Sequence, residues 1–157
     1  MIAVNQAIPN VTLKVMGAEG PEEVQTDALF ADKKVVMFSL PGAFTPTCSA
    51  AHLPGFVVKS DDIMAKGVDR IVCMSVNDVF VMDAWGKSQN ADMITMLADG
   101  NADFSEALGL DLDATAWGMG VRSKRFAMVV ENGVLTHLAI DEKGLDKTSA
   151  EAVLAVL

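Results

Sequence analysis

The chain has 157 residues, of which 51% are hydrophobic, so it is long enough to form one domain with a sizeable core. Its 12 basic and 21 acidic residues give a net charge of −9, which argues against nucleic acid or an anionic membrane as a partner, because phosphate binding needs clustered Lys and Arg. No apolar run approaches the roughly 18 residues of a membrane span, and the first residues do not form a secretory signal. We expect a single cytoplasmic domain over residues 1–157.

Strand-like and helical segments alternate along the chain. Asn77-Asp78 and the capping box from Thr148 to Glu151 are helix-start signals, Pro54-Gly55 should bend or split a helix, and Asn132-Gly133 predicts a tight hairpin. The expected elements are the strand 33–40, the helix 49–66, the strand 70–76, the helix 79–87, the strand 93–97, the helix 103–108, the strands 126–131 and 134–140, and a helix opened by residues 148–151.

This order predicts an α/β fold. Alternating strands and helices indicate parallel crossovers, and the late hairpin adds antiparallel strands. A mixed central β-sheet flanked by helices satisfies both features, and the thioredoxin-like fold is its simplest version.

One of the only two cysteines stands where a helix should begin. Thr45 suits the N-cap, Pro46 the first helical position, and Cys48 then lies in the first turn. The free N–H groups and the dipole of a helix start favour an anion such as a thiolate. A small buried cysteine that only packs fits the same spacing, so local pattern leaves both interpretations open.

The residues around Cys48 carry a resemblance to a known family. The segment 41–56, PGAFTPTCSAAHLPGF, closely resembles the active-site segment of the peroxiredoxins, and HLPGF is typical of their type II, peroxiredoxin-5-like branch. Pro41, Thr45 and Cys48 match the family pattern. Segments 72–85 and 122–134 are similar to two further motifs of the branch, in the same order.

The resemblance implies a thiol-dependent peroxidase without cofactor or metal, which reduces hydrogen peroxide and alkyl hydroperoxides. Cys48 would be the peroxidatic nucleophile, converted to a sulfenic acid. Arg125 would stabilise the thiolate and the leaving oxygen, Thr45 would orient the peroxide, and Pro41 would shield the sulfur. For Arg125 the alternative is a solvated strand-end charge, a description that suits Lys124 and Arg122 better.

Two other uses of the thiol have to be weighed. A peroxide-sensing redox protein would use the same cysteine without turnover. A thiol–disulfide oxidoreductase usually needs Cys-x-x-Cys, and here Thr45 stands at the first position. His52, four residues after Cys48, is a less favoured general base, and a metal site is weaker still, because Cys73 and His137 add no matching ligand spacing.

Cys73 lies in a predicted buried strand, where packing is the default role. Type II relatives carry a cysteine at this spacing, which makes Cys73 a candidate resolving residue. The segment 144–154, where other members carry theirs, has no cysteine. We favour an external reductant, glutathione with glutaredoxin or thioredoxin. A disulfide needs Cα atoms within roughly 7 Å, and a cysteine buried in a strand and one on a helix seldom come that close without movement.

The resemblance also implies a homodimer formed through loops around the active site. Pro46, Phe80 and Trp85 are the expected interface residues. Phe80 and Trp85 are five apart on one helix, so either one can instead belong to the core.

Overall fold

The computed structural model describes residues 1–157, and a seven-stranded mixed sheet with the strand order β2-β1-β5-β4-β3-β8-β9 forms its centre. Strands β3, β4 and β5 are parallel, while β8 is antiparallel to both β3 and β9. The strands are β1 (Thr12–Gly17), β2 (Gly20–Gln25), β3 (Lys34–Ser39), β4 (Arg70–Ser75), β5 (Thr95–Ala98), β8 (Arg125–Glu131) and β9 (Val134–Asp141), with β6 (Asp111–Asp113) and β7 (Val121–Ser123) in a separate two-stranded sheet.

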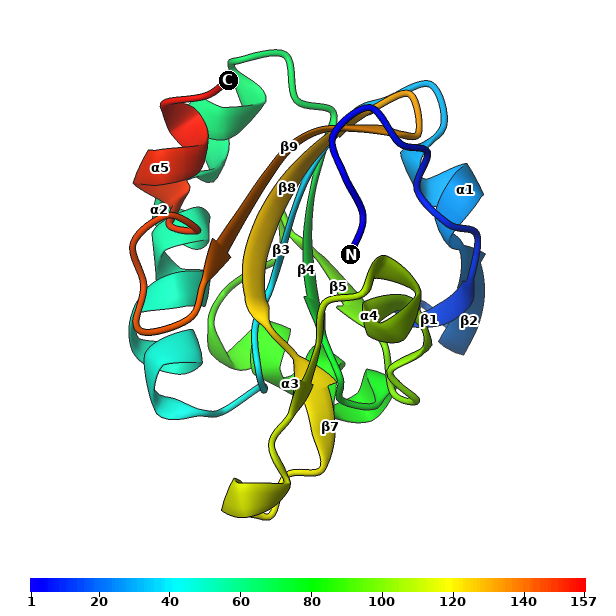
Figure 1. The fold of residues 1–157 in the computed structure, drawn as a ribbon, viewed down its shortest axis with the longest axis vertical. Helices are drawn as coiled ribbons and strands as arrows, with labels where there is room; N and C mark the ends of the chain where they lie inside the picture. Colours follow the sequence, from blue (N-terminus) through cyan, green and yellow to red (C-terminus); the bar gives the residue numbers. More distant parts are fainter.

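Helices cover both faces of the large sheet. In Figure 1, α2 and α5 lie on one side of it and α1 and α4 on the other. The helical segments are α1 (Thr26–Phe30), η1 (Cys48–His52), α2 (Leu53–Met64), α3 (Val79–Ser88), α4 (Asp103–Leu108), η2 (Thr115–Trp117) and α5 (Ala150–Leu154). None of them is long and apolar enough to cross a membrane.

The buried central strands explain the two layers of core. Side chains alternate across a strand, so Val36 and Phe38 of β3 face the cluster that includes α2, α3 and α5, while Val35 and Met37 face the cluster that includes α1 and α4. Because both faces are covered, β3 is a continuous apolar run and shows no polar alternation. The predicted α/β fold with a mixed, helix-flanked sheet is confirmed.

The structure also corrects several boundaries and adds elements. β5 begins at Thr95, two residues later than expected, and the C-terminal helix is capped by Ser149, whose hydroxyl accepts from Ala152 N at 3.1 Å. The expected cap, Thr148, uses its hydroxyl elsewhere. The hairpin β1–β2 and the arm β6–β7 were not predicted, because these segments are short and largely polar or exposed. α1 was not predicted either, because its five residues are too few to show a helical period, although three of them are buried.

Candidate active site

A tightly bonded loop leads from β3 into the helical segment that carries Cys48. The Thr45 hydroxyl donates to Gly42 O at 2.6 Å, and Ala43 N donates to the side-chain oxygen of Asn77 at 2.9 Å. Phe44 takes a left-handed conformation with φ 63°, which is uncommon for a non-glycine residue. The loop shape is therefore held by a hydrogen bond within the loop and by Asn77, which lies between β4 and α3.

The helix begins at Pro46, as predicted, but Thr45 does not cap it with its side chain: the Thr45 hydroxyl donates to Gly42 O and accepts no backbone N–H of the first turn. The turn Cys48–His52 is a π-turn, in which Leu53 N donates to Cys48 O five residues earlier. Pro54 has no N–H and its ring would crowd the carbonyl one α-turn back, so a wider turn suits it. Helical conformation nevertheless continues without a gap from residue 46 to residue 64, so the π-turn before Pro54 distorts the helix but does not split it.

Arg125, the first residue of β8, joins the two key side chains of this turn. Its Nη2 donates to Cys48 Sγ at 3.4 Å, and its Nη1 donates to His52 Nδ1 at 2.7 Å. Cys48 is only 1% exposed, so this positive charge faces the sulfur inside the protein. A guanidinium keeps its charge at any working pH and has a rigid fork of donors, so Arg125 can stabilise a thiolate at Cys48.

His52 has no free position for a proton from the thiol. Its Nε2 lies 3.0 Å from the Thr148 carbonyl oxygen, which can only accept, so Nε2 carries the hydrogen and Nδ1 offers a lone pair to Arg125. Burial and the Arg125 charge lower the pKa of His52 to about 3. The ring is neutral and fully engaged, which argues against the general-base alternative.

Pro41 is half-buried and borders a cavity of about 150 Å³ that Arg125 also lines. Its carbonyl accepts from Arg122 Nη1 at 3.4 Å, while Arg122 Nε donates to Met119 O at 2.9 Å. The interpretation of Arg122 as a solvated charge was therefore wrong: it ties the active-site loop to the segment before β7. Only its contact geometry reveals this role, since no local motif marks it.

Lys124 does behave as a strand-end charge. Its Nζ lies 3.8 Å from a carboxylate oxygen of Glu142, a weak contact at the protein surface. It provides a natural control for Arg125, one residue away in the chain.

Cys73 lies on β4, in the same apolar cluster as Cys48. It is fully buried, and burial, followed by the proximity of Cys48, raises the pKa of its thiol well above the ordinary value. Both cysteines are free. In this conformation Cys73 is a packed thiol without a donor to ionise it.

The expected interface residues separate into two groups. Trp85 is fully buried and its Nε1 donates to Ser49 Oγ at 3.0 Å, so of the two alternatives left open for this residue, interface or core, the core holds. Phe80 is 64% exposed and Pro46 is exposed. The Trp85 indole therefore stabilises the π-turn through Ser49, while Phe80 and Pro46 remain available for a contact with another protein.

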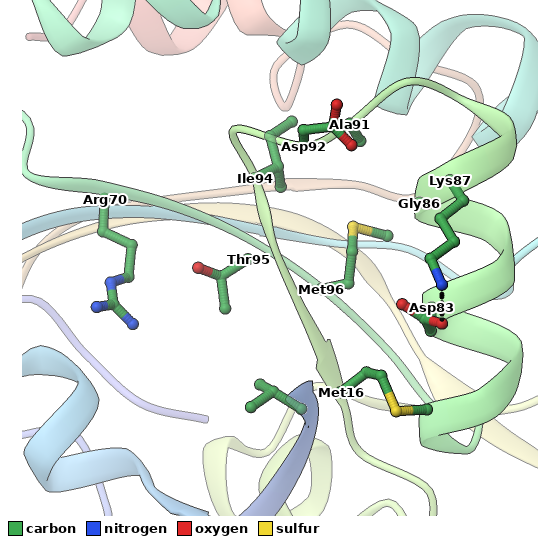
Figure 2. Close-up of a pocket in the computed structure, with 11 residues that line it drawn as sticks. Met16, Arg70, Asp83, Gly86, Lys87, Ala91, Asp92, Ile94, Thr95 and Met96 are labelled. Carbon is green, nitrogen blue, oxygen red and sulfur yellow. Dashed lines mark ion pairs between the residues drawn. The ribbon is translucent and has the colours of Figure 1, made fainter. Parts of the chain in front are cut away.

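A second pocket is larger than the cavity beside Arg125, and none of the predicted catalytic residues lines it (Figure 2). Its volume is about 390 Å³, and it opens where β1 and β5, paired only at Lys14 and Ala98, diverge. Asp83 and Lys87 on α3 form an ion pair of 2.9 Å at its edge. It contains no cysteine, and no group of three or more metal-ligating side chains occurs anywhere in the chain.

A thioredoxin-like sheet and a buried cysteine at a helix start, contacted by an arginine, define a thiol-based redox protein. Comparisons narrow this class. The Redoxin family profile matches residues 3–154. Peroxiredoxin-2D of Arabidopsis thaliana is 40% identical over 159 residues, covering 99% of this chain and 98% of the relative.

Solved structures agree with this result. Reduced Prx3 from Vibrio vulnificus in complex with H2O2 is 52% identical, with a TM-score of 0.96 and 99% of each chain covered. Peroxiredoxin 5 from Alvinella pompejana is 30% identical, with a TM-score of 0.88 over 99% of this chain and 97% of that one. The chain belongs to the Redoxin family, and within it to the type II, peroxiredoxin-5-like branch of the peroxiredoxins. It is a thiol-dependent peroxidase.

Proposed function

We propose that Cys48 is the peroxidatic residue of this peroxidase. Its thiolate attacks one oxygen of the peroxide, the O–O bond breaks, and an S–O bond forms. The sulfur is oxidised to a sulfenic acid, and the other oxygen leaves as hydroxide or alkoxide, which takes up a proton equivalent to the one that the thiol released on ionising and becomes water or an alcohol. Hydrogen peroxide and alkyl hydroperoxides share this O–O bond and are the proposed substrates.

The observation that carries the proposal is the Arg125 fork, with one nitrogen 3.4 Å from Cys48 Sγ and the other held by His52. Negative charge begins on the sulfur and moves toward the leaving oxygen during the attack. A fixed cation beside the sulfur stabilises the thiolate and the developing charge without reorganising in the transition state.

Thr45 and Pro41 are proposed to complete the site. Because the Thr45 hydroxyl donates to Gly42 O, its lone pairs remain available to accept a hydrogen from the peroxide. Pro41 lines a small cavity together with Arg125, and Arg122 holds its carbonyl; from there Pro41 would shield the sulfur. The two residues would orient the peroxide and limit competing water.

The site of oxidation can be read directly. The reduced protein is treated with one equivalent of hydrogen peroxide in the presence of dimedone, and peptides are analysed by mass spectrometry. We expect the adduct on Cys48 and none on Cys73. An unmodified Cys48 in protein that has consumed the peroxide would overturn the assignment.

We propose an external thiol as the reductant, glutathione with glutaredoxin or thioredoxin. The support is the complete burial of Cys73 in a strand paired on both sides, which leaves it poorly placed to attack the sulfenic acid. The alternative is an internal Cys48–Cys73 disulfide formed after local unfolding. Turnover with each reductant, and the mass of the peroxide-treated protein, distinguish these routes.

We also propose a homodimer built on exposed apolar side chains. Three aromatic side chains and Pro46 support it: Phe80 is 64% exposed, Phe44 58% and Trp117 75%. An acidic chain resists self-association through charges, so the contact should be mainly apolar. Analytical ultracentrifugation of the reduced protein and of Phe80→Arg tests it: the variant should sediment as a monomer, and a monomeric wild type at high micromolar concentration would refute the dimer.

We propose the cytoplasm as the place of action, because glutathione and thioredoxin keep thiols reduced there. Cell fractionation with an antibody against the protein tests this. Enrichment in an organelle fraction would contradict it.

A further inference from the structure

Asp141, the last residue of β9, lies opposite Arg125 in the β8–β9 register, yet the two form no ion pair. Its carboxylate instead accepts four hydrogen bonds from the loop that follows. The donors are Asp146 N at 2.9 Å, Lys147 N at 3.1 Å, Thr148 N at 3.0 Å and Thr148 Oγ1 at 2.7 Å. Asp141 therefore does not engage the guanidinium of Arg125, which contacts His52 and Cys48 instead.

The loop is held by an ionised group. Burial works against ionisation of Asp141, but the donors from Asp146, Lys147 and Thr148 outweigh it and lower its pKa to about 2. Asp141 remains a carboxylate at any pH at which the enzyme works, and the loop keeps its bonds.

Thr148 connects this loop to the active site. Its N–H and hydroxyl bind Asp141, and its carbonyl accepts from His52 Nε2 at 3.0 Å. If the carbonyl moved away, the ring could carry its hydrogen on Nδ1 instead. An Nδ1–H would then face Arg125 Nη1, donor against donor, across the present 2.7 Å contact.

We propose that Asp141 is a positioning residue for peroxide reduction: through Thr148 it sets the His52 tautomer that anchors Arg125 beside Cys48. The inference rests on the proposed role of Cys48. An arginine side chain has many rotamers, and anchoring one of its terminal nitrogens directs the other toward the sulfur. The structure places no hydrogen bond between Asp141 and the sulfur, so its effect passes through the other three residues.

Asp141 also supports the chain leading into α5, so its loss lowers stability whatever its part in catalysis. Asp99 offers a matched control. It is fully buried and accepts from Phe104 N at 3.0 Å, Ser105 N at 2.9 Å and Ser105 Oγ at 2.7 Å. It serves α4, whose buried side chains belong to the other apolar cluster, and has no bond to the active site.

The test compares Asp141→Ala with Asp99→Ala. Sulfenic acid formation at Cys48 is measured in a single turnover well below both melting temperatures, and the ring nitrogens of His52 are followed by 15N NMR. Both variants should melt lower than the wild type. Only Asp141→Ala should slow Cys48 oxidation, by about tenfold, and only it should mix the His52 tautomers.

Asp141→Asn provides a milder variant in case the alanine variant does not fold. Its oxygen can replace the one that accepts from Asp146 N and from both Thr148 donors, leaving its NH2 group against Lys147 N–H. We expect a smaller slowing with a partial change of tautomer.

Two outcomes overturn the inference. One is a wild-type rate of Cys48 oxidation in Asp141→Ala, and the other is an unchanged Nε2–H tautomer of His52. Failure of the proposed function looks different, because Cys48 of the wild type would then not be oxidised at all. The tautomer measurement needs no peroxide and still decides whether Asp141 sets His52.

Discussion

Cys48 and Cys73 belong to one apolar cluster and are almost equally buried, at 1% and 0% exposure, yet their polar surroundings differ completely. Cys48 lies in the first turns of a helical segment with Arg125 Nη2 3.4 Å from its sulfur. Cys73 lies inside a parallel sheet, paired in register with Phe38 and Met96, and no charged donor reaches its thiol. Burial alone therefore does not distinguish a reactive thiol from an inert one.

The backbone reinforces the difference. A strand held on both sides restrains Cys73, whereas the π-turn Cys48–His52 is a wider, less regular turn between a proline-bounded loop and α2. Conformational change after oxidation is easier to accommodate around Cys48. The same comparison suggests four experiments, given from the largest expected effect to the smallest.

Replacing the sulfur of Cys48 should remove the activity entirely. Cys48→Ser keeps the size of the side chain, but a serine hydroxyl beside Arg125 is not ionised at neutral pH and does not attack peroxide. Peroxide consumption with glutathione and glutaredoxin, or with thioredoxin, measures the effect. Turnover near the wild-type value in this variant would assign the nucleophile to another residue.

Removing the charge beside Cys48 should make its surroundings more like those of Cys73. We expect Arg125→Met to slow the oxidation of Cys48 by about 10²-fold, the usual cost of losing one preorganised donor at a developing charge. Lys124→Met is the control, because this neighbour contacts only Glu142. Stopped-flow measurement of the first oxidation step compares them, and equal slowing by the two variants would mean that general charge, and not the fork, matters.

The local chemistry around Cys48 was largely predictable from the sequence, but its supporting network was not. Pro46 marks the start of the helix and Pro54 the distorted turn because proline acts through its own backbone. Thr148, by contrast, contacts His52 from 96 positions further along the chain, and Asp141 reaches His52 only through Thr148. Only the sheet register and the path of the loop bring these residues together. Long-range contacts of this kind have no local signature.

The same limit explains why the sequence left Trp85 undecided between interface and core and why Arg122 was misjudged. Both were judged from helix spacing or position at a strand end, which indicate polarity but not partners. Trp85 donates to the hydroxyl of Ser49, and Arg122 donates to the carbonyl of Pro41. Both acceptors belong to segments far away in the sequence. The strands β3, β4 and β8 were predicted well because buried apolar runs carry their own signal.

The neutral His52 that supports Arg125 should make the fold sensitive to acid. Its pKa falls from 6.5 when unfolded to about 3 when folded, so the unfolded chain binds more protons between these values. Stability is then complete above about 6.5 and is lost as the pH falls toward 3, by about 1.4 kcal/mol for each pH unit in the middle of this window. Asp141, with a pKa of about 2, adds a loss only below roughly pH 4.

Urea unfolding at a series of pH values measures this slope. His52→Gln should flatten it between pH 6 and 4, while His137→Gln, the same change at the other histidine, should leave it in place. A wild-type slope in His52→Gln would show that other groups cause the acid sensitivity.

The smallest effect on turnover is expected at Cys73. With an external thiol as reductant, Cys73→Ser should keep the steady-state rate within about twofold of the wild type, since a buried thiol with a raised pKa takes no part in the first step. The variant should nevertheless melt at a lower temperature, because a hydroxyl replaces a thiol in the apolar cluster around Phe38 and Trp85. Peroxidase assays and thermal melts of the same preparation separate the two consequences. Loss of turnover with a normal first oxidation of Cys48 would instead assign the resolving step to Cys73, and a Cys48–Cys73 disulfide in the peroxide-treated wild type would then be its product.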